Sequence, residues 1–334
     1  MPLLRVTVVG AGAVGGYFGA RLAARGVPVT FWVRPTRAEV LRTQGLVVHS
    51  PLGDVHVAEP HVVTEVGALS GSDLVLLAVK NYHLPALVAG LAQLAGSGTC
   101  VLPLLNGIEH YDLLDRHLGR SWVLGATAQI FASLDANGAV RHTGALHHLT
   151  VGPRAAGQEP LCQEFAALCL EAGVPCQVRE DITPAIWTKF VMIVALAGVT
   201  AAARVPVGSV VGHAATEDVF RTVLGEMLAL AEAEGVVLPA AFAADLMARL
   251  RTLPAAATTS LLEDLVHGRP LELDALLGAA IRRARRLGAA VPTVETLFGL
   301  LEPWEQGTAA GAPHKAARSA TVAKPHNAER TPLA

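Results

Sequence analysis

The sequence predicts an α/β half built on a doubly wound parallel sheet, followed by an all-helical half. Short apolar runs alternate with helical patterns up to about residue 180, a glycine-rich turn follows the first run, and only helical patterns continue to about residue 305. The 334 residues are enough for two domains of ordinary size, which we place at residues 1–180 and 181–306. Residues 307–334, rich in Ala, Thr and Pro, are expected to form a disordered tail.

Five apolar runs are assigned to strands that alternate with helices. They are Arg5–Val9, Val29–Val33, Leu74–Ala78, Thr99–Leu104 and Trp122–Ala126. An irregular β stretch is expected within residues 46–63, and further strands at Ala139–Thr143, Leu146–Val151 and Val174–Arg179. A helix is expected over Glu164–Ala172, ending at Gly173. The alternation predicts the doubly wound sheet.

In the helical half, proline and acidic residues mark the helix starts. Thr183-Pro184 opens one helix, Thr216 to Asp218 opens a second that Gly235 closes, Pro239 starts a third, and Leu271–Leu287 forms a fourth. The apolar run Phe190–Ala203 is too short and too interrupted by glycine to span a bilayer. We therefore predict a buried helix there and no membrane association.

Composition excludes several classes of protein. The net charge of −2 and the 16% charged residues give no sign of a nucleic acid or an anionic membrane as partner. The chain enters a strand almost at once, without a secretory signal, so a cytoplasmic location is expected. The four cysteines are interpreted as small core residues, and His147-His148 has no ligand partners at metal-site spacing, so no metal is predicted.

The strand Val6–Val9 runs into the motif Gly10-Ala11-Gly12-Ala13-Val14-Gly15. Gly10 permits the tight turn, Gly12 lets the backbone approach a pyrophosphate, and Gly15 lets the following helix pack closely on the strand. The helix N-terminus, at Ala13 and Val14, then presents free N–H groups to the phosphates. The segment predicts a Rossmann-like dinucleotide site; the alternative is a glycine-rich turn that binds nothing.

The second strand ends at Arg34, where an NAD-preferring site usually has a carboxylate. An arginine there pairs with a 2′-phosphate, which favours NADP(H), and Arg37 is a candidate for a second contact. The alternative is that Arg34 is a solvated residue at a strand end.

Lys80 and Asn106 follow two apolar strands, at the edge where open α/β sheets bind ligands. Their alternative role is to cap turns.

Lys189 is the only charge in the apolar stretch from Ala185 to Ala203, and burial would lower its pKa enough for proton transfer near neutral pH. A lysine that reaches solvent from the helix start is the alternative. The hydroxyl and acidic residues of 258–264 and 272–274 fit helix caps and site residues equally well.

These motifs together resemble the ketopantoate reductase (2-dehydropantoate 2-reductase) family over residues 4 to 303. The resemblance rests on the glycine motif, Val79-Lys80, Asn106-Gly107, Trp187-Thr188-Lys189, Thr200-Ala201 and, most specifically, Ser260 to Asp264 ahead of Gly268 to Asp274 and the Arg282-Arg283-Ala284 run. It implies a Rossmann-like domain joined to an all-α domain of the 6-phosphogluconate dehydrogenase C-terminal type, with the active site in the cleft between them.

The resemblance also implies roles for individual residues. Lys189 matches the catalytic lysine, which donates a proton to the ketone oxygen, and Glu272 matches an essential carboxylate that holds cofactor ribose or the reacting hydroxyl. Ser260 matches a residue that binds the substrate carboxylate. The positions matched by Asn106 and Lys80 contact cofactor and active site, and Arg34 matches the arginine that favours NADPH.

The chain departs from the family pattern where substrate-binding asparagines are usual: Ile193, Ala197 and Ala257 occupy those positions. The leading hypothesis is NADPH-dependent reduction of a 2-oxo acid, with 2-dehydropantoate to (R)-pantoate as the single best substrate. The alternatives are a divergent paralogue with the same chemistry on another carbonyl substrate, and a non-catalytic NADP-binding protein. The small apolar residues of the helical half suggest a homodimer.

Overall fold

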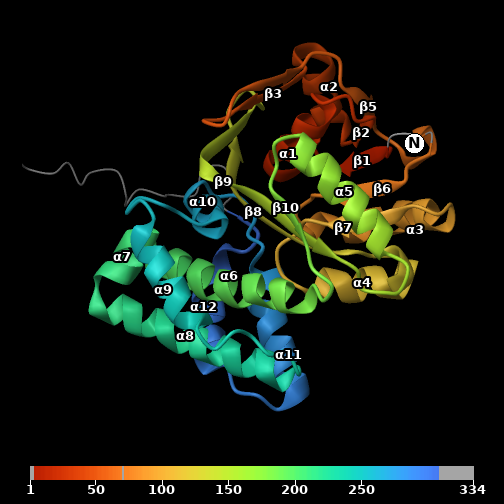
Figure 1. Cartoon of the computed structure of the whole chain (residues 1–334). Helices are drawn as coiled ribbons and strands as arrows, with labels where there is room; N and C mark the ends of the chain where they lie inside the picture. Colours follow the sequence, from red (N-terminus) through yellow and green to blue (C-terminus); the bar gives the residue numbers. More distant parts are fainter. Residues whose placement is uncertain (1–3, 70, 308–334) are drawn as a thin grey trace, which may run out of the picture.

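The computed structural model describes residues 4–69 and 71–307, which form an α/β half and a helical half that meet along β8 and α6 (Figure 1). The remainder of the predicted tail, residues 308–334, lies outside the described residues.

A five-stranded sheet, ordered β5-β2-β1-β6-β7, forms the centre of the α/β half. The central strand β1 (Val6–Val9) is wholly buried and pairs in parallel with β2 (Val29–Trp32) and β6 (Leu74–Leu77). The edge strands are β5 (His61–Val63) and β7 (Cys100–Pro103). The chain order reverses at β1, so the carboxyl ends of β1 and β6 form the crevice where doubly wound folds bind ligands. The predicted doubly wound sheet is confirmed.

Four helices and several short 3₁₀ turns accompany this sheet. The helices are α1 (Ala13–Ala23), α2 (Pro35–Gln44), α3 (Val88–Gly96) and α4 (Glu109–Leu118), and the turns are Val66–Ala68, Asn81–His83, Pro85–Leu87 and Arg120–Trp122. α2 starts at a proline, whose fixed φ suits the first turn. α4 has acidic residues in its first turn and basic residues in its last turn, as the helix dipole favours.

A second five-stranded sheet differs from the expectation of a single doubly wound sheet. Its order is β10-β9-β3-β4, and β8 pairs with β9. The strands are β3 (Leu46–His49), β4 (Val55–Val57), β8 (Gly125–Leu134), β9 (Val140–Gly152) and β10 (Cys176–Val178). The strand predicted at Trp122–Ala126 begins at Gly125 and runs further, and the two strands predicted within 139–151 are one. Each strand was visible locally, but pairing such as Val48 with Val140 joins distant segments.

The segment from 159 to 178 places the cysteines in the core. α5 (Glu159–Glu171) begins earlier than predicted, because Pro160 occupies its first turn, and it ends before Gly173, whose φ is +71°. Cys162 and Cys169 lie buried on α5, and Cys176 lies on β10. All four cysteines are free thiols. Cys162 and Cys169 lie in the core as predicted, whereas Cys100 and Cys176 are partly buried and pack against it.

The helical half is built around α6 (Thr183–Ala203), which packs against α8, α10 and α12. The other helices are α7 (Val207–Gly212), α8 (Ala214–Ala233), α9 (Phe242–Thr252), α10 (Ser260–Val266), α11 (Ala279–Leu287) and α12 (Pro292–Leu301), with a π-helical turn at Asp274–Gly278 and a 3₁₀ turn at Glu302–Trp304. α6 is long and apolar enough to cross a membrane, but 61% of its apolar 18-residue stretch is buried inside the protein. The predicted buried helix is confirmed.

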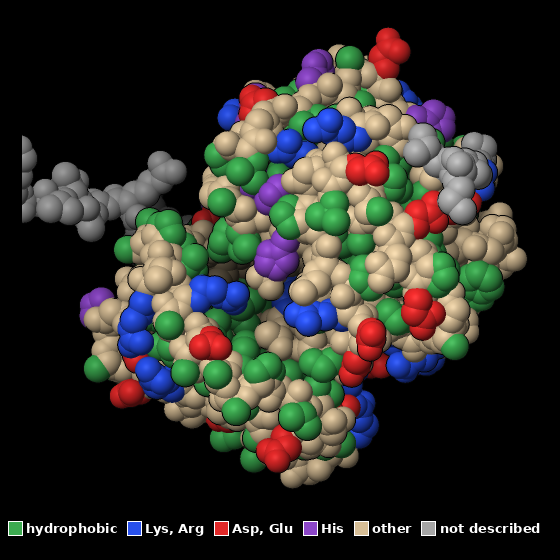
Figure 2. Space-filling view, viewed as in Figure 1, with side chains coloured by type: hydrophobic (Ala, Val, Ile, Leu, Met, Phe, Trp, Pro, Cys, Tyr) green, Lys and Arg blue, Asp and Glu red, His purple; other side chains and the backbone are tan. Residues whose placement is uncertain are grey.

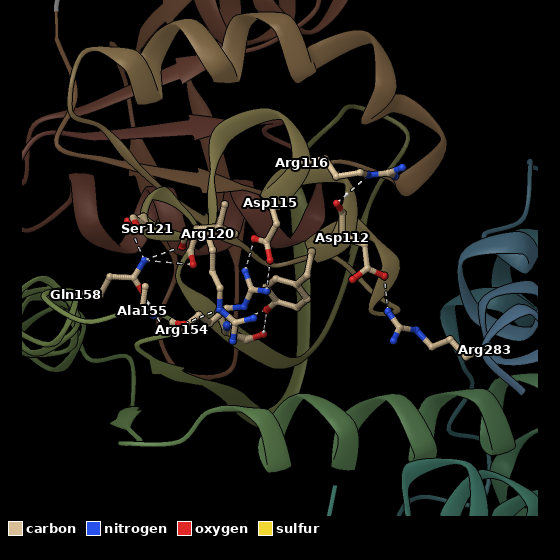
Figure 3. A network of polar contacts seen from close by, with 12 residues as sticks. Asp112, Asp115, Arg116, Arg120, Ser121, Arg154, Ala155, Gln158 and Arg283 are labelled. Atoms are coloured by element: carbon tan, nitrogen blue, oxygen red, sulfur yellow. Dashed lines mark hydrogen bonds and ion pairs between the residues drawn. The ribbon is translucent and has the colours of Figure 1, made fainter. Parts of the chain in front are cut away.

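One apolar core runs through both halves. It joins residues of the α/β half, such as Leu77 of β6 and Tyr111 of α4, to residues of α6, such as Trp187 and Phe190. Arg283 of α11 adds an ion pair to Asp112 of α4, close to the Arg154–Asp115 pair of the α/β half (Figure 3). The relative position of the halves is therefore set by packing and by charge.

The loop after β7 makes a close approach to the helical half. Gly107 has a φ of +77°, and a Cβ there would lie 2.2 Å from the carbonyl oxygen of Ala275. Only glycine fits this position without a shift in backbone. The approach brings Asn106 against the segment that carries Glu272.

Candidate active site

The glycine-rich turn between β1 and α1 is built for close backbone approach. Gly10 has a φ of +90°, and a Cβ on Gly15 would lie 2.2 Å from the carbonyl oxygen of Gly10. At Gly12, by contrast, a Cβ would meet nothing within 4 Å, so this side of the turn is open. α1 has neither a side-chain cap nor an acidic residue in its first turn. The first N–H groups of the helix, at Ala13 and Val14, are therefore available to an anionic ligand.

The two arginines near this turn differ in their contacts. Arg34 is exposed at the N-terminus of α2, and within the described residues its guanidinium has no hydrogen-bond or ion-pair partner. Arg37 donates from Nε to the carbonyl oxygen of Ala11 at 2.8 Å and from Nη1 to that of Gly138 at 2.7 Å. Arg37 thus holds the turn in place, and Arg34 is the arginine left free at the strand end.

The Glu272 carboxylate is the centre of a cluster that crosses between the halves. It is only 5% exposed. Its Oε1 accepts hydrogen bonds from the backbone N of Asn81 at 2.9 Å and from Asn81 Nδ2 at 2.8 Å. Its Oε2 accepts from Lys80 Nζ at 3.2 Å and from Asn106 Nδ2 at 3.3 Å. All of these donors come from the α/β half, so Glu272 is satisfied only when the halves are docked.

A second carboxylate shares the Lys80 ammonium. Asp264 Oδ2 lies 2.8 Å from Lys80 Nζ, and Asp264 Oδ1 accepts from Arg269 Nε at 2.7 Å. Burial would lower the pKa of Lys80, but the carboxylates of Glu272 and Asp264 outweigh burial and raise that pKa above its usual value. Lys80 therefore stays a cation at the carboxyl end of β6.

Lys189 has a different environment. It lines a cavity of about 200 Å³ between β8, α6 and α9, whose other lining residues are Gln129, Thr188, Met192, Pro239, Phe242, Asp245, Leu246 and Arg249. Among the described residues, no group pairs with its Nζ by a hydrogen bond or ion pair. Burial lowers the pKa of Lys189 to about 8, against a smaller opposing effect of the Glu272 carboxylate. The surface between the two halves is hollowed on the face shown in Figure 2, with basic side chains at its edges.

His110, at the start of α4, is a buried neighbour of this centre that sequence reasoning missed. Within the described residues, neither of its ring nitrogens has a hydrogen-bond partner, and its ring lies beside that of Tyr111. Burial, and after it the charge of Lys189, lower the pKa of His110 to about 3. The imidazole is therefore neutral at physiological pH and adds no second positive charge beside Lys189.

The structure brings together most of the residues singled out from the sequence. Lys80, Asn106 and Glu272 are in direct contact, and Lys189 is close enough to Glu272 for its pKa to respond. Ser260, the first residue of α10, is exposed and is absent from the lining of the Lys189 cavity. Its neighbour Thr259 caps the helix by accepting from Leu262 N at 3.3 Å.

Two members of the carboxylate cluster were not identified as site residues in the sequence. Asn81 directly follows Lys80 at the end of β6, and that adjacency was an available signal. Asp264 was left open between cap and site residue. It lies inside α10, where it caps nothing, and is 7% exposed. Ile193, Ala197 and Ala257 pack against the apolar core and add no polar group.

Comparison with known proteins gives a consistent result for this arrangement. Residues 6–156 match the family model described as ketopantoate reductase PanE/ApbA, and residues 181–306 match the model of its C-terminal domain. An uncharacterized oxidoreductase, YkpB, of Bacillus subtilis is 32% identical and covers 90% of this chain and 99% of its own length. A 2-dehydropantoate 2-reductase of Halobacterium salinarum is 30% identical, with coverage of 89% and 98%. The crystal structure of a PanE/ApbA family ketopantoate reductase from Ralstonia eutropha superposes with a TM-score of 0.82 at 30% identity, covering 90% of this chain and 98% of the other.

Proposed function

Because the chain belongs to the ketopantoate reductase family, whose members are oxidoreductases that use a nicotinamide cofactor, we propose that it reduces a 2-oxo acid to a 2-hydroxy acid with NADPH. The substrate that we propose first is 2-dehydropantoate, which would give (R)-pantoate. The observation that carries the proposal is Lys189, an unpaired ammonium with a pKa of about 8 that faces a cavity large enough for a small acid. The active site is then the region between the glycine-rich turn, the Glu272 cluster and this cavity.

Lys189 acts as the general acid in this proposal. Its lowered pKa leaves it largely protonated at neutral pH and makes the ammonium a better acid than an ordinary lysine. The cation also stabilises the negative charge that develops on the ketone oxygen as the carbonyl carbon is reduced. After each turnover, the neutral amine regains a proton from water.

Glu272 orients the other polar groups around that centre. Its four hydrogen bonds fix the side chains of Lys80, Asn81 and Asn106 at the carboxyl ends of the strands. The hydroxyl groups of a polar ligand placed there would replace one or more of these hydrogen-bond donors to Glu272. We propose that Lys80 and Asn106 contact cofactor, that Asn106 also borders the substrate, and that Glu272 receives a ribose or substrate hydroxyl.

The glycine-rich turn fits a dinucleotide phosphate. The open space at Gly12 and the uncapped N-terminus of α1 suit a pyrophosphate next to Gly10, Ala13, Val14 and Gly15. The free guanidinium of Arg34 suits a 2′-phosphate, so the proposed cofactor is NADPH. When bound, the reduced nicotinamide supplies the hydride.

The identity of the oxo acid is the finer part of the proposal. Ile193, Ala197 and Ala257 pack in or against the apolar core, and these positions, where the resemblance leads us to expect asparagines, supply no amide to a substrate hydroxyl. This observation favours the second candidate, the same reduction on another 2-oxo acid. Ser260 remains our sequence-based candidate for the substrate carboxylate. A non-catalytic NADP-binding protein would have no use for the unpaired cation of Lys189.

The proposal is tested by NADPH oxidation with the purified protein. Ketopantoate is compared with branched and linear 2-oxo acids, and Lys189→Ala is the matched inactive variant. We expect turnover of at least one 2-oxo acid, a loss of kcat of about 10²- to 10⁴-fold in Lys189→Ala, and NADPH affinity close to that of the wild type. Tight NADPH binding without turnover of any carbonyl substrate would instead identify a non-catalytic binding protein.

The remaining expectations accompany this proposal. The 1–180 and 181–306 boundaries, a cytoplasmic location and a homodimer stay predictions, as does the absence of nucleic-acid and membrane partners. Analytical ultracentrifugation of the full chain measures the oligomeric state directly.

A further inference from the structure

Arg249 of α9 is a second cation in the Lys189 cavity. Its guanidinium donates from Nη2 to the thioether sulfur of Met192 at 3.1 Å, and sulfur is a weak acceptor. In the part of the chain that the structure describes, no carboxylate forms an ion pair with it. Arg251, two residues further along α9, instead contacts both carboxylate oxygens of Glu217, at 2.8 and 2.7 Å. Arg249 is thus the arginine of this helix whose donors are left for a ligand.

The rest of the cavity lining is mostly apolar, with two neutral polar side chains. Met192, Pro239, Phe242 and Leu246 supply hydrocarbon surface, and Gln129 and Thr188 supply an amide and a hydroxyl. The volume of about 200 Å³ is sufficient for a small organic acid. Such a cavity matches a molecule with one anionic end and a compact apolar body.

We propose that Arg249 binds the carboxylate of a 2-oxo monocarboxylic acid with a branched apolar side chain, while Lys189 contacts its ketone oxygen. This inference rests on the proposed reductase function and names the substrate class of the same site. It assigns the carboxylate to Arg249 in place of Ser260, which is exposed and does not line this cavity. The carbonyl and the carboxylate of a 2-oxo acid are on adjacent carbons, so two cations from α6 and α9 facing one small cavity suit this pair of groups. A guanidinium forms two parallel hydrogen bonds to a carboxylate, which fixes its orientation as well as its charge.

The carboxylate of Asp245 favours monocarboxylic over dicarboxylic oxo acids as substrates. It lies one helical turn before Arg249, lines the same cavity, and within the described residues is not ion-paired to it. Its carboxylate repels a second carboxylate on the substrate, so dicarboxylic oxo acids are disfavoured. On α6, the side chains of Met192 and Ile193 that follow Lys189 are apolar and supply no alternative anchor for a carboxylate.

The test measures binding separately from turnover. Isothermal titration calorimetry follows N-isobutyl oxamate, an unreactive mimic of a branched 2-oxo acid, and its neutral primary amide, each added to the NADPH-saturated protein. We expect Arg249→Met to weaken oxamate binding about 30- to 100-fold. Arg249→Lys should weaken it about 10-fold, because the pair of parallel hydrogen bonds is lost but the positive charge is kept. Binding of the amide should change less than about threefold in either variant.

Arg251→Met is the matched control, because it removes the same group from the same helix outside the cavity. It should leave oxamate binding unchanged. Equal binding of oxamate by Arg249→Met and wild type, equal binding of oxamate and amide by wild type, or no binding of oxamate by wild type would each overturn the assignment of Arg249.

Steady-state kinetics with 4-methyl-2-oxopentanoate separates this inference from the reductase proposal. Turnover with a KM that rises in Arg249→Met more than kcat falls supports both. Turnover that is insensitive to Arg249→Met overturns the role of Arg249 and leaves the reductase standing. Oxamate binding that depends on Arg249 without reduction of any oxo acid contradicts the reductase and keeps the anion site.

Discussion

Replacing Lys189 by Met should make the protein more stable while abolishing the proposed chemistry. The ammonium is held without a partner in a site that lowers its pKa from 10.5 to about 8. Each unit of pKa shift is about 1.36 kcal/mol, so keeping this lysine charged in the folded state costs about 3 kcal/mol at neutral pH. Met has a similar length and no charge, and it therefore removes the cost without leaving a cavity.

The gain in stability has a definite dependence on pH. At pH 7 the lysine is charged in both the folded and the unfolded chain, so the full cost is present. Above the folded pKa of about 8, the folded protein loses its proton while the unfolded chain keeps it, and the cost falls as pH rises toward 10.5. The advantage of Lys189→Met should therefore fall from about 3 kcal/mol at pH 7 to about half that at pH 9.5.

Urea denaturation of the wild type and the variant at both pH values measures this difference in the free energy of unfolding. Lys80→Met is the matched control and should destabilise the protein, because its loss leaves the buried Glu272 carboxylate without a cation and Asp264 with Arg269 alone. The reasoning would be refuted by a Lys189→Met protein that is no more stable than wild type at pH 7, or by an advantage that does not shrink as pH rises.

Three further predictions concern the cofactor and the substrate. Arg34→Glu should lower the kcat/KM ratio of NADPH over NADH by about 10- to 100-fold, since a charge-assisted contact to the 2′-phosphate becomes a repulsion; an unchanged ratio in the same assay would place the phosphate elsewhere. Gly15→Ala should destabilise the protein by about 1–3 kcal/mol in urea denaturation, because its Cβ would meet the backbone at 2.2 Å, whereas Gly12→Ala should leave stability unchanged and weaken NADPH binding; equal stability losses in both would contradict the geometry. Since Ile193 and Ala257 offer no amide to a substrate hydroxyl, ketopantoate and trimethylpyruvate, which lacks that hydroxyl, should differ by less than about tenfold in kcat/KM, and a preference above about 10³-fold would speak against an apolar pocket.

Local patterns were sufficient for the parallel sheet and for the buried helix. Val6–Val9 followed by the glycine motif determines strand, turn and helix within one short segment, and the alternation of strands and helices indicates a parallel sheet. Similarly, the apolar run Phe190–Ala203 indicated a buried helix, and the structure contains it as part of α6.

The second sheet could not be assigned from the sequence, because its pairing joins distant segments. β3 pairs with β9 across the α/β half, and no short-range turn signal links them. β8 also runs further than predicted, since its outer residues are only partly buried and carry a weaker apolar pattern.

The candidate site was predicted to the extent that residues stand at strand ends or break an apolar pattern. Lys80, Asn106 and Lys189 have such signals. Asp264 has none, because an acidic residue in a short helix has the same pattern whether it faces solvent or a buried lysine. Arg249 and Arg251 are equally indistinct in the sequence, and only the cavity and the Glu217 pair separate them.

The Glu272 cluster has a consequence for how the molecule opens. A buried carboxylate supplied by one half takes its hydrogen-bond donors from Lys80, Asn81 and Asn106 of the other. Separating the halves would therefore leave the Glu272 carboxylate without its hydrogen-bond donors and would also divide the common apolar core. Amide hydrogen exchange in the α/β half and the helical half should accordingly report a single global opening, in which neither half survives as a folded remnant without the other.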